Sequence, residues 1–134
     1  MKKIFIILFI IIPYLSISQG YKYFGKSHDE IISSVKLNKN IEIMDDLPDY
    51  IHTVDGVKLN NIIFFLENNK CYEVHTTYQI ETDYEKVHNY FDVIYLKDEE
   101  NVWHFDFDKG RQVTYLEKKK GFFVAKDIFF SSKK

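Results

Sequence analysis

Apolar residues recur at helical spacing directly after a capping signal near residue 27. Ser27 and Glu30 have the spacing of a capping box, in which each side chain accepts a hydrogen bond from the other residue's backbone amide. Ile31 and Val35 follow four residues apart, so their side chains lie on one side of a helix. The pattern predicts a helix over Ser27–Leu37.

A second stretch repeats this arrangement near residue 82. Thr82 and Glu85 have the same capping-box spacing, and Val87 and Phe91 then follow four residues apart. The pattern predicts a second helix over Asp83–Phe91.

Strand-like segments rich in β-branched and aromatic residues follow each predicted helix. The predicted strands are Tyr50–Val54, Val57–Leu66 and Cys71–Ile80 after the first helix, and Val102–Phe107, Gln112–Glu117 and Phe122–Phe129 after the second, with shorter strands at Ile41–Met44 and Val93–Leu96. Turns are predicted at Asp55-Gly56, Glu67–Lys70, Asp108–Gly110 and Lys118–Gly121. Such short connections imply antiparallel pairing between consecutive strands.

The order of these elements predicts an α+β fold, with one or two helices packed on a mainly antiparallel sheet. One helix and three strands recur in the same order, so a tandem α-β-β-β pseudo-repeat is one interpretation. Chance agreement is the other, because few residues match between the two halves. The pattern leaves open whether the two halves form one sheet or two.

Side-chain alternation assigns residues to the faces of these strands. Over Asn61–Leu66 both faces are apolar, which predicts a central strand covered on both sides. Trp103, with the two aromatic residues that alternate after it, is expected to point inward. Cys71 and His75 are expected on the same strand face, about 13 Å apart, too far for a thiolate–imidazole pair.

The first 18 residues have the three parts of a secretory signal peptide. Two lysines precede the apolar run Ile4–Ile17, and Ser16 and Ser18 form a small-x-small cleavage pattern. As a helix the run would reach about 21 Å, short of a hydrocarbon core of about 30 Å. We therefore predict cleavage near Ser18, a single small α+β domain over residues 19–134, and a periplasmic or secreted protein. An uncleaved N-terminal anchor is the alternative.

Composition limits the classes of partner. Without Lys2 and Lys3 the chain has 16 basic and 20 acidic residues, so residues 19–134 carry a formal charge of −4. No basic field is present to bind phosphates, so a nucleic-acid partner is not expected. The single Cys71 excludes an internal disulfide, and we expect its thiol to be buried. The bias toward Ile, Lys, Asn and Phe is typical of AT-rich bacterial genomes.

The first helix start resembles a family motif. Residues Gly25–Ile31 read Gly-Lys-Ser-His-Asp-Glu-Ile. This motif and the coarse topology resemble small exported helix-on-sheet domains, namely the SmpA/OmlA-type envelope lipoproteins and the tandem-domain β-lactamase inhibitor proteins. The chain departs from them because no Leu-Gly-x-Pro follows the helix and no lipid-accepting Cys is present. The resemblance implies a fold of helices on an antiparallel sheet and action by protein–protein contact, and it carries over no site residues.

Candidate chemistry is sparse. The sequence has no Gly-rich phosphate loop and no Gly-x-Ser-x-Gly motif, so we predict no catalytic residues and no cofactor. Glu73 with His75, and His104 with Asp106, each project from one strand face and are candidate metal ligands if their strands lie together. The alternative is that all four are polar residues on a solvent-facing sheet surface.

Two hypotheses for function follow. The first is an exported, non-catalytic protein that presents one sheet face to a protein partner in the bacterial envelope or outside the cell, and it would be favoured by an exposed aromatic patch on that face. The second is a periplasmic small-molecule or metal-binding module, or a weak hydrolase, which would need a cavity with convergent polar groups. A purely structural envelope component is a third possibility. Tyr21, Tyr23 and Phe24, after the predicted cleavage point, are expected to pack on the core rather than on a partner.

Overall fold

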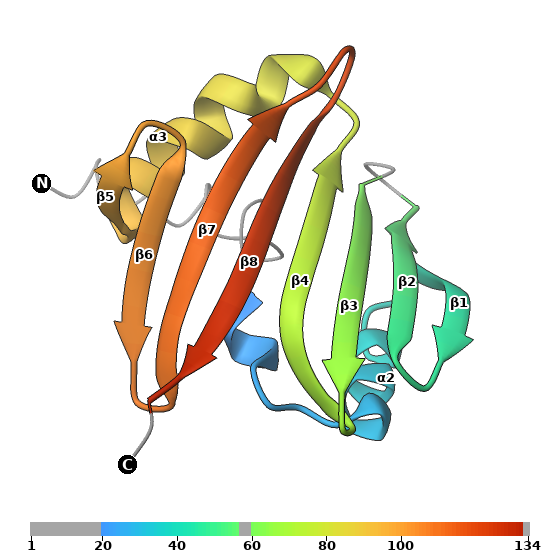
Figure 1. Cartoon of the computed structure of the whole chain (residues 1–134). Helices are drawn as coiled ribbons and strands as arrows, with labels where there is room; N and C mark the ends of the chain where they lie inside the picture. The colour runs from blue at the N-terminus through green and yellow to red at the C-terminus, as the bar shows by residue number, and fades with distance from the viewer. Residues whose placement is uncertain (1–19, 57–59, 133–134) are drawn as a thin grey trace, which may run out of the picture.

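The computed structural model describes residues 20–56 and 60–132. These residues form one antiparallel sheet of eight strands in the order β1-β2-β3-β4-β8-β7-β6-β5 (Figure 1). The helices α2 and α3 lie on one face of this sheet, behind the strands as drawn in Figure 1. The predicted α+β class with helices on an antiparallel sheet is confirmed.

The chain runs through a helix and four strands twice. In the first half these are η2 (Gly20–Tyr23), α2 (His28–Lys36), β1 (Ile41–Leu47), β2 (Tyr50–Asp55), β3 (Asn61–Glu67) and β4 (Lys70–Tyr78). In the second half they are η3 (Glu81–Asp83), α3 (Tyr84–Ile94), β5 (Leu96–Glu99), β6 (Val102–Phe107), β7 (Gly110–Lys118) and β8 (Phe123–Ser131). Each half therefore has the helix and three strands of the predicted repeat, with a fourth strand at the sheet edge. The first of these edge strands, β1, includes the short strand predicted at Ile41–Met44, whereas β5 begins only at Leu96, the last residue of the strand predicted at Val93–Leu96. Pairing of β4 with β8 joins the two halves into one sheet.

The first predicted helix forms as its sequence indicates. The Ser27 hydroxyl accepts a hydrogen bond from the Glu30 amide, and Glu30 Oε1 accepts one from the Ser27 amide, both at 3.2 Å. Ile31 and Val35 are buried against β2 and β3. The capping box thus fixes where α2 begins, and its apolar side fixes which way it faces.

The second helix departs from its prediction at both ends. Residues 81–83 form the 3-10 turn η3, and Asp83 at the N-cap makes no side-chain capping bond. The capping box expected at Thr82 is therefore absent. At the other end α3 continues to Ile94, through residues predicted as a strand, because Phe91 and its neighbours on that side pack in the core. Here tertiary packing overrides the local signals.

Two turns also differ from their predictions. After Asp55 the chain does not form a two-residue hairpin, because the Asp55 amide bonds the Asn60 carbonyl and β3 begins at Asn61. The strand start predicted at Val57 lies outside the described residues. Gly110, the last residue of the turn predicted at Asp108–Gly110, instead opens β7 opposite Phe107. A Cβ at Gly110 would lie 1.9 Å from the Phe130 carbonyl oxygen, so close backbone approach requires the glycine.

A β-bulge changes the faces of β4. Leu66 pairs with Cys71 and Phe65 pairs with Glu73, which leaves Tyr72 as an extra residue. Cys71 is consequently buried on the helix side, whereas Glu73 and His75 point to the opposite side. The prediction that Cys71 and His75 share a face is wrong, because strict alternation does not hold across a bulge.

Two apolar clusters fill the space between sheet and helices. The cluster under α3 contains Tyr78, Val87, Tyr90, Phe91, Tyr95, Trp103, Leu116, Phe123 and Ala125. The cluster under α2 contains Ile31, Val35, Ile51, Ile62, Phe64, Leu66, Cys71, Val74 and Phe129. Tyr23 packs edge-on against Phe64, and Tyr21 and Phe24 contact Phe105 and Phe107. The aromatic residues before α2 therefore pack on the core, as predicted.

Two positions on α3 test this packing. Phe91 is fully buried, whereas Val93, two residues later on the same helix, is 76% exposed. We expect Phe91→Ala to lower the free energy of unfolding by about 3–5 kcal/mol, because it removes buried surface and leaves a cavity. Val93→Ala should change it by less than about 0.5 kcal/mol. Urea denaturation followed by tryptophan fluorescence measures both values, and equal effects would contradict the assigned packing.

Candidate functional site

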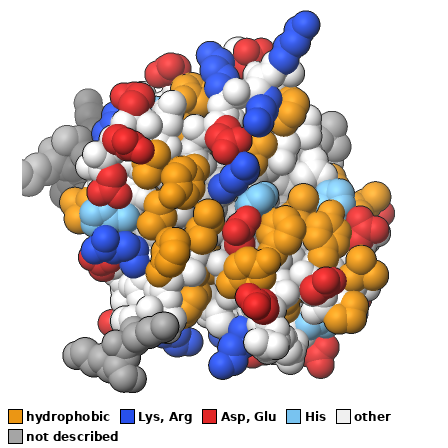
Figure 2. Space-filling view, viewed as in Figure 1, with side chains coloured by type: hydrophobic (Ala, Val, Ile, Leu, Met, Phe, Trp, Pro, Cys, Tyr) orange, Lys and Arg blue, Asp and Glu red, His pale blue; other side chains and the backbone are white. Residues whose placement is uncertain are grey.

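The sheet face opposite the helices is not covered by any other described element, and we call it the open face (Figure 2). Strand register places one residue from each strand in a single transverse row across it. This row is Leu47, Tyr50, Phe65, Glu73, Ile128, Val113, His104 and Leu96. Six of these eight side chains are apolar or aromatic, although they lie on the side that faces solvent.

The apolar side chains of the open face form two patches. The first patch, on β1–β3, contains Leu47, Tyr50, Ile63 and Phe65. The second patch, on β5–β8, contains Leu96, Val102, Val113, Tyr115, Ile128 and Phe130. Leu47, Leu96 and Phe130 are more than half exposed. Figure 2 shows these hydrophobic groups on either side of a strip of charged side chains and a histidine.

The central strip lies on β4, β8 and β7, where the two halves of the sheet meet. His75 contacts the Glu73 carboxylate, and Lys126 donates to Glu117 Oε1 at 3.0 Å. The Phe65 ring lies 4.7 Å from the His75 ring, so the first patch continues into the strip. The open face thus combines apolar contact area with polar groups at its centre, an arrangement found on protein-binding surfaces.

The two patches occupy matching positions in the two halves. In the first half His52 lies opposite Ile63, and Tyr50 lies opposite Phe65. In the second half His104 lies opposite Val113, and Val102 lies opposite Tyr115, on the corresponding strands. A histidine, an aliphatic residue and an aromatic residue therefore recur with the same spacing on the open face of each half.

Each patch is bounded by a histidine–aspartate pair at the sheet edge. His52 Nδ1 lies 3.3 Å from Asp45 Oδ2 on β1, and His104 Nδ1 lies 2.7 Å from Asp98 Oδ1 on β5. Both aspartates stand at a bulge of their edge strand. The bulges and carboxylates make both edges poor templates for adding a further strand.

The four candidate metal ligands do not come together. Glu73 and His75 pair with each other on β4, whereas His104 pairs with Asp98, and Asp106 accepts from Arg111 Nε at 2.6 Å. Strands β8 and β7 separate β4 from β6, which places the two pairs about 14 Å apart. Among the described residues no three His, Cys, Asp or Glu side chains are grouped so that they could hold a metal ion.

The helix side of the sheet has a buried polar group between its two apolar clusters. Gln112 Nε2 donates to Thr114 Oγ1 at 2.7 Å, and Thr114 Oγ1 donates to Asp127 Oδ1 at 2.7 Å. All three side chains are fully buried and bond to one another. Burial raises the pKa of the Tyr95 hydroxyl, and the charge of the nearby Asp127 carboxylate raises it further. Because these residues are fully buried, they are not accessible to a substrate in solvent.

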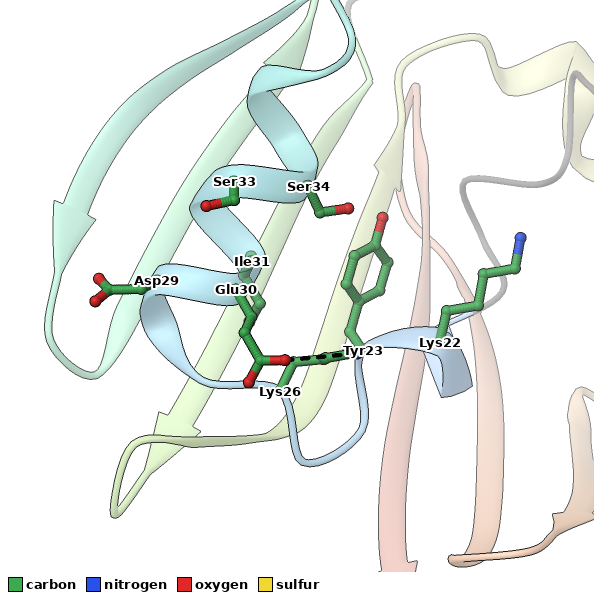
Figure 3. Close-up of a pocket in the computed structure, with 8 residues that line it drawn as sticks. All are labelled: Lys22, Tyr23, Lys26, Asp29, Glu30, Ile31, Ser33 and Ser34. Carbon is green, nitrogen blue, oxygen red and sulfur yellow. Dashed lines mark ion pairs between the residues drawn. The ribbon is translucent and has the colours of Figure 1, made fainter.

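A shallow groove of about 470 Å³ lies between η2 and α2 (Figure 3). Lys26 forms an ion pair with Glu30 at 3.6 Å across its lower end, and Lys22 points away from the other labelled polar groups. Tyr23 forms one wall, and the exposed hydroxyl-bearing residues Ser33 and Ser34 lie on the helix. The groove offers no convergent set of polar atoms around a ligand.

Cys71 is the single thiol of the chain and is buried beneath Tyr23 and α2. Burial raises the pKa of this thiol to about 12, with a smaller raising effect from the Glu73 charge. The thiolate that a nucleophile requires is therefore not formed near neutral pH.

This burial predicts the reactivity of the thiol. At pH 8 the folded chain should release no chromophore from Ellman's reagent over an hour, while the chain unfolded in guanidinium should release one equivalent within minutes. Ser33→Cys, which adds an exposed thiol on α2, should release one equivalent without denaturant. Rapid labelling of Cys71 in the folded chain would contradict the assigned burial.

His28 predicts a pH dependence of stability. Its ring contacts Asp29 and also Asp46 on β1, so it ties the start of α2 to the sheet edge. The hydrogen bond to Asp29, followed by that to Asp46, raises the pKa of His28 above 6.5. A raised pKa means that the stabilisation is fully present below pH 6.5 and is lost as the pH rises through the folded-state value.

We therefore expect the wild type to exceed His28→Gln in free energy of unfolding at pH 5.5, by at most about 1 kcal/mol because the pair is partly exposed. The difference should shrink between about pH 6.5 and pH 8. Urea denaturation of both proteins across this pH range measures the difference in free energy of unfolding. A difference that stays constant or grows with pH would contradict the assignment.

Comparisons with protein-family models, with curated proteins and with solved structures found no match for this chain. Within the described residues, no helix is long and apolar enough to cross a membrane.

Proposed function

We propose that this chain is an exported, non-catalytic bacterial protein that binds a protein partner through the open face of its sheet. The observation that carries the proposal is the pair of apolar patches that no described element covers, with Phe65 in the first and Tyr115 in the second. Aromatic side chains at the centre of a surface supply much of the energy of protein association.

The dimensions of the open face suit such an interface. Eight strands about 4.8 Å apart span about 34 Å, and strands of six to nine residues give most of it a height of about 20 Å. A stable interface buries about 800 Å² on each partner, close to the area of this face. The bulged, acidic edge strands favour contact through the face rather than by addition of a strand.

The alternatives have less support in the described residues. A small-molecule site would need polar groups that converge on a cavity, and the polar group at Gln112 is fully buried, with Gln112 Nε2 bonded to Thr114 and Asp127. A four-ligand metal site would need Glu73 and His104 to meet, and two strands lie between them. A hydrolase with a cysteine nucleophile would need an accessible thiolate, whereas the sulfur of Cys71 is buried and protonated.

Export is the second part of the proposal, and it rests on the signal-peptide pattern of residues 1–18. A small domain whose single thiol is buried suits an oxidising compartment, because it has no exposed sulfur to cross-link. Both the periplasm and the cell exterior are consistent with export. The resemblance at Gly25–Ile31 to exported domains that act by protein contact agrees with this reading.

A capture experiment tests both parts. The full chain with a C-terminal affinity tag is expressed with its own N-terminal segment and recovered from cell-envelope and culture-supernatant fractions. We expect one protein to co-purify in stoichiometric amount with the wild type and to be absent with the double variant Phe65→Ser/Tyr115→Ser. The intact mass of the recovered chain should correspond to cleavage after Ser18.

The control is a second double variant, Leu37→Ser/Val93→Ser, which also removes two exposed apolar side chains but on the helix side, at 86% and 76% exposure. It should retain the partner. If both double variants retained the partner, or if no stoichiometric partner were found, the result would count against the open face as the contact surface. Circular dichroism and melting temperatures establish that each variant is folded.

A further inference from the structure

We infer that the surface that docks on the open face is basic, with Lys and Arg side chains placed around an apolar centre; this inference rests on the proposed function. The observation that carries it is the excess of carboxylates over cations on the open face. Complementary charge steers association and excludes partners of like charge.

Carboxylates outnumber cations on the open face. By strand register and side-chain pairing, eight carboxylates and four cations project from it. The carboxylates are Glu42, Asp45, Glu67, Glu73, Asp98, Glu99, Asp106 and Glu117, and the cations are Lys70, Arg111, Lys119 and Lys126. With the histidines neutral, the face therefore carries a formal charge of −4.

The open face holds more than half of the net charge of the described residues. Residues 20–56 and 60–132 contain 20 acidic and 13 basic residues, which gives a formal charge of −7. The open face contributes −4 of this charge, and the remaining described residues contribute −3.

The cations of the open face lie beside carboxylates of the same face. Arg111 forms two hydrogen bonds with Asp106, at 2.6 and 3.1 Å, Lys119 and Lys126 both pair with Glu117, and Lys70 stands opposite Glu67. An acidic partner would compete with these carboxylates for the cations. The exposed Glu42 on β1 and Glu99 on β5 lie at opposite edges of the face, so the negative charge extends around both apolar patches.

This charge selects among possible occupants. A second copy of the chain would bring two faces of −4 together across desolvated apolar patches, which is unfavourable. Anionic lipid headgroups and nucleic acids would be repelled for the same reason. A protein surface with apolar side chains bordered by Lys and Arg fits both the patches and their surroundings.

A selection experiment tests the inference without a known partner. A phage-displayed library of random 12-residue peptides is selected on the immobilised full chain, recovered as above. We expect the enriched peptides to combine aromatic or aliphatic residues with an excess of Lys and Arg. Their Kd should rise at least tenfold in 0.5 M NaCl, because salt screens exposed charges.

Variants of the chain locate the selected peptides and test the charge. Binding should weaken at least tenfold for Phe65→Ser/Tyr115→Ser and about threefold for Glu42→Gln or Glu99→Gln. It should not change for Glu85→Gln, which removes an exposed carboxylate from α3 on the helix side.

The outcomes separate the two proposals. Peptides that need Phe65 and Tyr115 but show no basic excess and no salt dependence would overturn the charge inference and leave the open face as a binding surface. Peptides that bind Phe65→Ser/Tyr115→Ser as tightly as wild type, or a failure to enrich any peptide, would count against the open face itself. Concentration-dependent dimerisation of the wild type, lost in the Phe65→Ser/Tyr115→Ser variant, would show that a second copy is the occupant and would overturn the inference.

Discussion

The pairing of β4 with β8 is the constraint on which the rest of the structure depends. Each half of the chain has four strands and one short helix, and its apolar cluster covers one side of a narrow sheet. Six residue pairs, from Glu73 opposite Ile128 to Tyr78 opposite Phe123, join these halves edge to edge. The joint removes two exposed edges and brings the two clusters together over one continuous sheet.

The same joint determines where the protein can make contacts. Because α2 and α3 lie on one side, the other side of all eight strands is left open, and the aromatic and aliphatic residues on it are not used by the described core. An antiparallel sheet with one solvated face ordinarily alternates apolar and polar residues. In this chain Phe65 and Tyr115 break that rule at matching positions in the two halves, which is why the open face is the candidate site.

Local signals predicted the fold where one interaction dominates, and failed where several compete. The Ser27–Glu30 capping box needs only its own four residues, so the start of α2 was predicted correctly. The same spacing at Thr82 does not form a cap, because burial of Phe91 and its neighbours sets the position of α3 instead. The bulge at Tyr72 depends on how β3 pairs with β4, and alternation alone placed Cys71 on the wrong face.

The sequence by itself determined the class of fold, the order of its elements and the absence of a basic field, because these depend on local periodicity and on composition. It also contained the signal for the site, since Asn61–Leu66 is apolar on both faces, but that pattern predicted a strand covered on both sides. Only the tertiary structure decided that no described element covers one side of this strand, that the histidine–carboxylate pairs at His75 and His104 lie apart, and that carboxylates outnumber cations on the open face. Those properties depend on strand order and on the side taken by the helices, which residues distant in the chain determine together.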